Sequence, residues 1–171
     1  MDSLCDGRER MMMAEYKPKT EYVVGFLFSK ERDRVVLIQK NRPDWQSGDL
    51  NGVGGHVNPG ETYAQAMRRE FLEEAGLDVP DWEEVASAEC PTVRIVFFRA
   101  FGDLSGVRVG EQSLTDERVR LAYLGNLFMN GSNSAGTKMV WPSGWIIGMC
   151  LDEELVLPVG ISYKTDGRRR R

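Results

Sequence analysis

The sequence predicts an α/β fold, in which helices cover both faces of one mixed sheet. Short runs of β-branched and aromatic residues recur along the chain, a long amphipathic segment lies between them, and a second helical segment follows near the end. The 171 residues, 42% of them hydrophobic, are enough for one domain with a sizeable core. We therefore expect a single α/β/α sandwich.

A β-hairpin is the first predicted element. Residues 22–28 and 34–39 are rich in β-branched and aromatic side chains, and the charged turn 30–33 separates them. A polar loop at 41–49 then leads into residues 50–57, where glycines interrupt apolar side chains. Such glycines permit a close approach of backbone segments, so we expect residues 50–57 to lie tightly against another element.

The first predicted helix begins after Thr62. Thr62 and Gln65 fit a capping box, and Gly76 lies where a left-handed C-terminal cap belongs. The apolar positions that recur at helical spacing are Ala64, Met67, Phe71 and Ala75. These signals predict an amphipathic helix between Thr62 and Gly76.

The second half of the chain adds strands and a second helix. Further strands are predicted at residues 83–89, 92–101 and 118–124. Residues 102–116 are predicted as a loop. A second helix is predicted over 144–151, with Ser143 as its N-cap.

The domain organisation follows from composition. Residues 1–18 are polar apart from three methionines and are predicted to be a loose arm, residues 19–160 form the domain, and residues 161–171 form a basic tail. Arg168 to Arg171 supply four positive charges, so the rest of the chain is more acidic than its net charge of −4 indicates. This acidity argues against a stable nucleic-acid partner.

The compartment is predicted from cysteines and apolar runs. The three cysteines are widely spaced and form no CxxC pair, which favours a reducing environment over a disulfide framework. No apolar run approaches the roughly 18 residues that span a bilayer, and the N-terminus has no apolar signal segment. We expect a cytoplasmic protein with no membrane partner.

Three glutamates on the first helix carry the predicted chemistry. At 100° per residue, Glu70, Glu73 and Glu74 lie on one arc, and like charges at this spacing cost roughly 0.2 to 0.5 kcal/mol per pair. A divalent cation would reverse the sign of that interaction, and Mg²⁺ in particular is held by carboxylates. A solvated, glutamate-rich helix face is the simpler alternative. Arg69 is expected to point to a different side of the helix and to anchor Glu61 or another acid.

The full pattern around these glutamates resembles the Nudix box. Residues 55–77 read GHVNPGETYAQAMRREFLEEAGL. They match Gly-x5-Glu-x7-Arg-Glu-apolar-x-Glu-Glu-x-Gly-apolar at every specified position, and a chance match is rarer than about one in a million chains. The chain is therefore similar to the Nudix hydrolases, within a MutT-like and oxidised-purine nucleoside triphosphatase-like subgroup.

The resemblance implies a Nudix-type α/β/α fold and a hydrolase of phosphoanhydride bonds in nucleotides. It also implies Mg²⁺, or Mn²⁺, as the cofactor. The metal ligands that it assigns are Glu70, Glu73, Glu74 and the Gly54 carbonyl. The catalytic set includes Arg69 as support, and the candidates for the general base are Glu73, Glu70, Glu117 and Glu111.

The resemblance also implies substrate contacts. Asn51 is a candidate for contact with the base and Trp141 for stacking on it, while Gly54 and Gly55 complete the predicted substrate-binding set. For Trp141 and for Trp45, packing in the core or at an interface is the alternative. Ser143 and Gly144 stand where the mammalian members of this subgroup have two aspartates, which places specificity for an oxidised purine in doubt.

Several readings stay open at this point. The leading one is release of pyrophosphate from a nucleoside triphosphate, with a role in sanitising the nucleotide pool. The alternatives are a hydrolase of ADP-ribose or a nucleotide sugar, and a Nudix-like module that binds a nucleotide without cleaving it. Family members are often dimers, so a homodimer is also an expectation. His56, the only histidine, is expected to be a loop residue rather than a catalyst.

Overall fold

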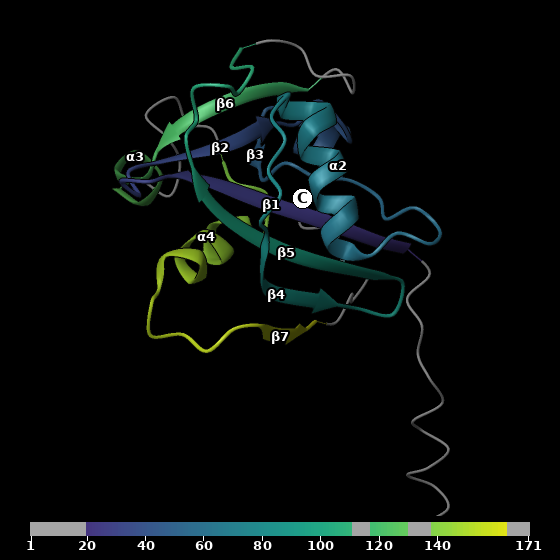
Figure 1. The fold of residues 1–171 in the computed structure, drawn as a ribbon. Helices are drawn as coiled ribbons and strands as arrows, with labels where there is room; N and C mark the ends of the chain where they lie inside the picture. The colour runs from purple at the N-terminus through teal and green to yellow at the C-terminus, as the bar shows by residue number, and fades with distance from the viewer. Residues whose placement is uncertain (1–19, 111–116, 130–137, 164–171) are drawn as a thin grey trace, which may run out of the picture.

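The computed structural model describes residues 20–110, 117–129 and 138–163. A mixed sheet lies between helices on its two faces, so the predicted α/β/α sandwich is confirmed (Figure 1). The strands are β1 Thr20–Ser29, β2 Arg34–Gln39, β3 Leu50–Asn51, β4 Glu83–Glu89, β5 Val93–Gly102, β6 Arg118–Tyr123 and β7 Val159–Ser162. The helices are the 3-10 turn η1 Asp44–Gln46 and the α-helices α2 Tyr63–Ala75, α3 Leu124–Met129 and α4 Ser143–Leu151.

The long parallel pairing of β1 with β5 forms the centre of the sheet. Thr20 pairs with Val93, and the register continues to Ser29 and Gly102. Along the sheet the order is β3-β2-β1-β5-β4-β7, with β6 paired to β2. Because β4 and β7 are also parallel while the remaining pairs are antiparallel, the sheet is mixed. The predicted hairpin of β1 and β2 is confirmed.

Alternating side chains of β1 divide the interior into two cores. Val23 and Leu27 point to the core that α2 covers, whereas Val24, Phe26 and Phe28 point to the core that α4 covers. This alternation follows from the two-residue period of a strand. β1 is therefore buried on both sides, as its nearly continuous apolar run requires.

Helix α2 begins and ends where its sequence signals predict. The Thr62 hydroxyl accepts a hydrogen bond from the Gln65 amide and the Gln65 side chain accepts one from the Thr62 amide, while Gly76 adopts φ +75°. Its buried apolar residues are Ala66, Met67, Phe71 and Ala75. Ala64, which shares the predicted spacing, is exposed. Glu70 and Glu74 are also buried on this helix.

Five features differ from the sequence-based expectations. The turn η1 lies inside the predicted polar loop, and β3, α3 and β7 were not predicted. Ser143 is the first residue of α4, but its side chain makes no capping hydrogen bond. The Ser143 hydroxyl donates to Asn51 on β3 instead, so the capping prediction is wrong.

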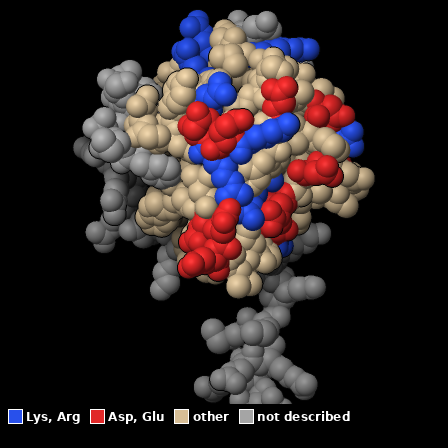
Figure 2. All heavy atoms as spheres, turned by 60° about the vertical axis from the view of Figure 1, so that its left-hand side comes forward, with Lys and Arg blue, Asp and Glu red and all other residues tan. Residues whose placement is uncertain are grey.

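The surface carries charges of both signs. On the face shown in Figure 2, Lys and Arg side chains lie among Asp and Glu side chains. Ion pairs between exposed side chains include Arg32 with Glu153 and Arg68 with Asp78. Among the described residues, no helix is long and apolar enough to cross a membrane.

Candidate active site

One cleft of about 830 Å³ collects most of the predicted site residues. Its walls come from α2, the glycine-rich segment after β3, and the ends of β1, β2, β5 and α4. The predicted residues that line it are Asn51, Gly54, Gly55, Glu70, Glu73, Glu74, Glu117 and Trp141. Glu111 lies outside the described residues. A single cavity thus joins carboxylates to an amide and aromatic side chains.

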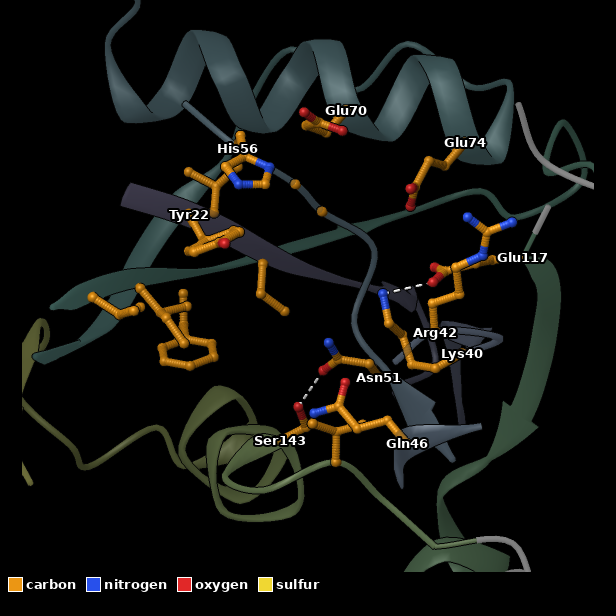
Figure 3. A pocket seen from close by; sticks show the side chains of 18 of the residues that line it. Tyr22, Lys40, Arg42, Gln46, Asn51, His56, Glu70, Glu74, Glu117 and Ser143 are labelled. Carbon is orange, nitrogen blue, oxygen red and sulfur yellow. Dashed lines mark hydrogen bonds and ion pairs between the residues drawn. The ribbon is translucent and has the colours of Figure 1, made fainter. Parts of the chain in front are cut away.

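The acidic end of the cleft consists of Glu70, Glu73, Glu74 and Glu117. Glu70 and Glu74 are buried, whereas the side chain of Glu73 is 45% exposed. Figure 3 shows Glu70 and Glu74 descending from α2 into the cleft, with Glu117 on another wall. The helical spacing therefore places the three glutamates of α2 along one cavity, as predicted.

Arg69 lies among these acids rather than on a separate side of the helix. Its guanidinium donates to both carboxylate oxygens of Glu61, at 2.7 and 2.9 Å, and to Glu70 Oε1 at 2.7 Å. It also lies 3.3 Å from Glu73 Oε2 and donates to the His56 carbonyl. The expected anchoring of Glu61 is confirmed, but the expectation that Arg69 points away is wrong, because its long side chain reaches back across the helix.

The hydrogen bonds from Arg69 lower the pKa of Glu61 from 4.5 to about 2, with a smaller contribution from the Asn58 amide. The same contact with Glu61 raises the pKa of Arg69 above its usual range. Both side chains therefore remain charged at neutral pH, and they fix the loop before α2 to the acidic end.

Two glycines allow the backbone to approach the acids. A Cβ atom on Gly55 would lie 2.5 Å from the Glu70 carboxyl group, and a Cβ atom on Gly54 would lie 2.0 Å from the Val23 carbonyl oxygen. The clash at Gly54 is with backbone, so that position requires glycine, whereas a side chain at Gly55 would have to push the Glu70 carboxyl group aside. The close approach brings the Gly54 and Gly55 backbone to the edge of the acidic end.

A lysine that the sequence analysis did not select pairs with Glu117. Lys40, directly after β2, places its Nζ 2.6 Å from Glu117 Oε1, because β2 and β6 are paired up to Gln39 and Arg118. Glu117 is 6% exposed, and its Oε2 atom has no hydrogen-bond partner within the described part of the chain. A position directly after a buried strand was the signal that could have identified Lys40.

The other end of the cleft, called the amide end here, consists of Asn51, Trp141 and Ser143. The Ser143 hydroxyl donates to Asn51 Oδ1, and Figure 3 shows this contact across the cleft from Glu70. Trp141 is 52% exposed and contacts Tyr163 at 5.3 Å between ring centroids. Trp45, 74% exposed, also lines the cleft. Their exposure rules out core packing for both indole rings.

The donor set fits a hard divalent cation. Carboxylates of Glu70, Glu73 and Glu74 and the nearby Gly54 backbone supply oxygen atoms only, which are the ligands that Mg²⁺ prefers. Among the described residues, no three acidic, histidine or cysteine side chains already converge as a metal site. One guanidinium nitrogen of Arg69 donates to both Glu70 and Glu73 and so occupies one oxygen of each carboxylate.

His56 lies at the mouth of the cleft. Its ring packs on Tyr22 with 4.2 Å between centroids, its side chain is exposed, and its carbonyl accepts a hydrogen bond from Arg69. Tyr22 and Arg42, which the sequence analysis did not select, line the same cavity. The structure thus adds two basic side chains, Lys40 and Arg42, to a cleft predicted mainly from acids.

The fold and this cleft define an α/β domain whose acidic end offers carboxylate and carbonyl oxygens to a divalent cation. The sequence model of the NUDIX domain matches residues 19–118, more than half of the chain. The chain belongs to this family.

Two curated relatives resemble a short part of the chain. The oxidized purine nucleoside triphosphate hydrolase of Danio rerio is 46% identical over 54 residues, which are 32% of this chain and 34% of that protein. The 8-oxo-dGDP phosphatase NUDT18 of Mus musculus is 43% identical over 56 residues, 33% of this chain and 17% of that protein. The similarity thus spans about a third or less of the length of either relative.

Solved structures share the fold over most of the chain. A NUDIX hydrolase from Nitrosomonas europaea superposes with a TM-score of 0.64 at 20% identity, over 88% of this chain and 82% of that one. The MutT protein from Bacillus halodurans gives 0.62 at 18% identity, over 86% and 92%. At these identities the likeness concerns the fold alone.

Proposed function

We propose that this protein is a Mg²⁺-dependent hydrolase that cleaves a phosphoanhydride bond in a nucleoside triphosphate or a related nucleoside diphosphate derivative. One observation carries the proposal: a single cleft joins an acidic end, rich in oxygen ligands, to an amide end lined by exposed tryptophan side chains. Its volume of about 830 Å³ suits a nucleotide-sized ligand. A polyphosphate would occupy the acidic end, and its base would occupy the amide end.

The carboxylates of the acidic end would repel a polyphosphate unless a positive charge lies between them. Glu70, Glu73 and Glu74, with the Gly54 carbonyl, would hold Mg²⁺ or Mn²⁺ there. When bound, such an ion neutralises phosphate oxygens and the charge that develops on them during displacement at phosphorus. The basic side chains of Lys40 and Arg42 line the same cavity and add attraction for a polyphosphate.

The chain's own acids would move the proton. Glu73 is the accessible carboxylate of α2, and Glu117 offers a buried Oε2 atom without a hydrogen-bond partner among the described residues. Either group could accept a proton from the attacking water, and its reach to that water decides which one does. Arg69 would keep Glu70 and the loop before α2 in position.

The names of the relatives suggest a substrate class. Both curated relatives act, by name, on oxidised purine nucleotides, so nucleotide-pool sanitation is part of the proposal. A NUDIX domain of Shewanella oneidensis NrtR, with a TM-score of 0.62 at 14% identity, is described in complex with ADP ribose. ADP-ribose therefore belongs among the substrates to be tested.

A substrate panel tests the proposal directly. Purified full-length protein is incubated with nucleoside triphosphates, deoxynucleoside triphosphates, 8-oxo-dGTP, ADP-ribose, NADH and dinucleoside polyphosphates, with Mg²⁺, with Mn²⁺ and with EDTA. We expect metal-dependent release of pyrophosphate or of a nucleoside monophosphate from at least one triphosphate. If ADP-ribose alone is cleaved, the substrate is ADP-ribose and not a nucleoside triphosphate. Tight binding of a nucleotide without any cleavage would indicate a binding module.

The cellular compartment and the oligomeric state are also part of the proposal. We infer a cytoplasmic protein, because Cys90 and Cys150 are free thiols, as a reducing compartment maintains them. A homodimer is proposed by analogy with the family. Light scattering on the full chain would test it.

A further inference from the structure

The ion pair between Lys40 and Glu117 joins two groups that the proposed chemistry needs separately. Lys40 Nζ lies 2.6 Å from Glu117 Oε1, and the second oxygen, Oε2, is buried without a hydrogen-bond partner among the described residues. One oxygen of the carboxylate is thus held by the ammonium group, and the other is shielded. In this arrangement Glu117 is poorly placed to accept a proton from water.

The sheet and its loops fix the backbone of both partners. The Lys40 amide donates to the Asp49 carbonyl at 2.8 Å, and the Lys40 carbonyl accepts from the Gly48 amide at 2.8 Å. Glu117 directly precedes Arg118, the first residue of β6, which pairs with the last residue of β2. The ion pair can therefore open by movement of the two side chains alone.

Lys40 lies where a polyphosphate in the cleft would pass. Its side chain is 20% exposed and lines the cleft, and Figure 3 shows it between Asn51 of the amide end and Glu74 of the acidic end. An ammonium group has three donor protons, so it can contact a carboxylate and a phosphate oxygen together. The two anions repel each other, however, so each weakens the hold of the ammonium group on the other.

We propose that Lys40 is a positioning residue whose ammonium group is shared between Glu117 and the polyphosphate of the substrate, so that Glu117 becomes available as the proton acceptor when substrate binds. The proton would pass from the attacking water to Glu117 Oε1. This proton transfer rests on the proposed function, whereas the sharing of Lys40 requires only that a polyphosphate binds. Because such coupling is reciprocal, a polyphosphate that loosens the ion pair binds more tightly when the pair is absent.

Binding of methylenediphosphonate in the presence of Mg²⁺ tests the sharing of Lys40. A carbon atom bridges the two phosphorus atoms of this pyrophosphate analogue, so hydrolysis does not complicate calorimetry. Glu117→Gln frees the ammonium group and should tighten binding about three- to tenfold. Lys40→Met should weaken binding about threefold in the wild type and about tenfold or more in the Glu117→Gln background, where no ion pair competes. Removal of the Glu117 charge alone would instead tighten binding by the same factor with and without Lys40.

Two exposed positions outside the cleft provide matched controls. Lys30→Met removes a lysine in the turn after β1, and Asp78→Asn breaks the ion pair with Arg68; both should leave the affinity unchanged. Thermal unfolding of each variant identifies any loss of fold. If Lys40→Met unfolds because Glu117 loses its partner, the comparison of Glu117→Gln with the double variant still measures the contact of Lys40 with the analogue.

The outcomes separate this inference from the proposed function. No binding of the analogue by the wild type, equal or weaker binding by Glu117→Gln, or an equal effect of Lys40→Met in both backgrounds would overturn the sharing of Lys40, even in an active hydrolase. In an active enzyme, Glu117→Gln should lower kcat about tenfold or more although it binds the analogue more tightly. Loss of a merely structural contact would not give these opposite signs. If the affinities change as expected while no triphosphate is hydrolysed, the shared lysine stands and the proposed hydrolase activity fails.

Discussion

The acidic end of the cleft takes most of its side chains from one helix, whereas the amide end combines side chains from β3 and from the start of α4. At the acidic end, Glu70, Glu73 and Glu74 are neighbours by helical spacing, and Arg69 on the same helix holds two of them. At the amide end, Asn51 and Ser143 meet only because a distant segment is hydrogen-bonded to β3.

This difference predicts that the acidic end determines turnover and that the amide end determines substrate selectivity. A helix fixes its side chains through local geometry, so the acidic end keeps its arrangement as long as α2 is folded. The amide end depends on tertiary contacts and on a few side chains that line the cavity. Changes at the acidic end should therefore alter turnover, and changes at the amide end should alter binding and discrimination.

The strongest test of this division is Glu73→Gln. We expect a loss of turnover of about a hundredfold or more, because a proton acceptor or metal ligand disappears. Folding should be retained, since the Glu73 side chain is 45% exposed and the helix keeps its length. Glu31→Gln, at an exposed position in the turn after β1, is the matched control. If Glu73→Gln unfolds while activity per folded molecule is unchanged, the assignment of the acidic end is wrong.

A smaller effect is expected from Gly55→Ala. The added Cβ atom would lie 2.5 Å from the Glu70 carboxyl group and displace it, which should lower turnover about ten- to hundredfold. Gly148→Ala serves as control, because a Cβ atom there meets nothing within 4 Å. The two variants are compared by steady-state kinetics and by thermal unfolding. Equal turnover in both would show that the position of Glu70 is unimportant.

At the amide end, Trp141→Ala should change binding more than turnover. Loss of a stacking surface worth about 1.4 kcal/mol would raise KM roughly tenfold and leave kcat nearly unchanged. Trp145 is 63% exposed and contacts Trp141 edge to face, yet it does not line the cleft, so Trp145→Ala is the matched control. A fall in kcat at constant KM would place Trp141 outside the base site.

The smallest effect concerns pH and the Arg69–Glu61 ion pair. The hydrogen bond from Arg69 lowers the pKa of Glu61 from 4.5 to about 2 in the folded protein. Its stabilising contribution is therefore complete above pH 4.5 and disappears as the pH falls towards 2. Chemical denaturation between pH 7 and pH 2 should show a flatter decline of stability for Glu61→Gln than for the wild type. Parallel curves would contradict the assignment.

Local signals made much of the fold predictable. The capping pair Thr62 and Gln65, the left-handed Gly76 and the β-branched and aromatic runs of β1 and β2 act within a few positions, so the sequence alone identified α2 and the hairpin. The glutamates of α2 were predictable for the same reason. The long parallel pairing of β1 with β5 has no local signal, and the sequence could indicate only that such strands exist.

Contacts between distant residues account for what was missed. Lys40 meets Glu117 through the pairing of β2 with β6, and Ser143 meets Asn51 through the segment beside β3. Ser143 also shows how a correct local pattern misleads: a serine at a helix start is a usual cap, but Asn51 on β3 takes its hydroxyl proton instead.

The central β1–β5 pair also sets an order of events during synthesis. Thr20 and Ser29 have their parallel partners at Val93 and Gly102, so more than half of the 171 residues must leave the ribosome before the middle of the sheet can form. Until then, the apolar side of α2 and both faces of β1 lack their final neighbours. We expect nascent chains that end before Gly102 to depend on chaperones, and the face of β1 that α4 covers to stay exposed until Leu151 has been added.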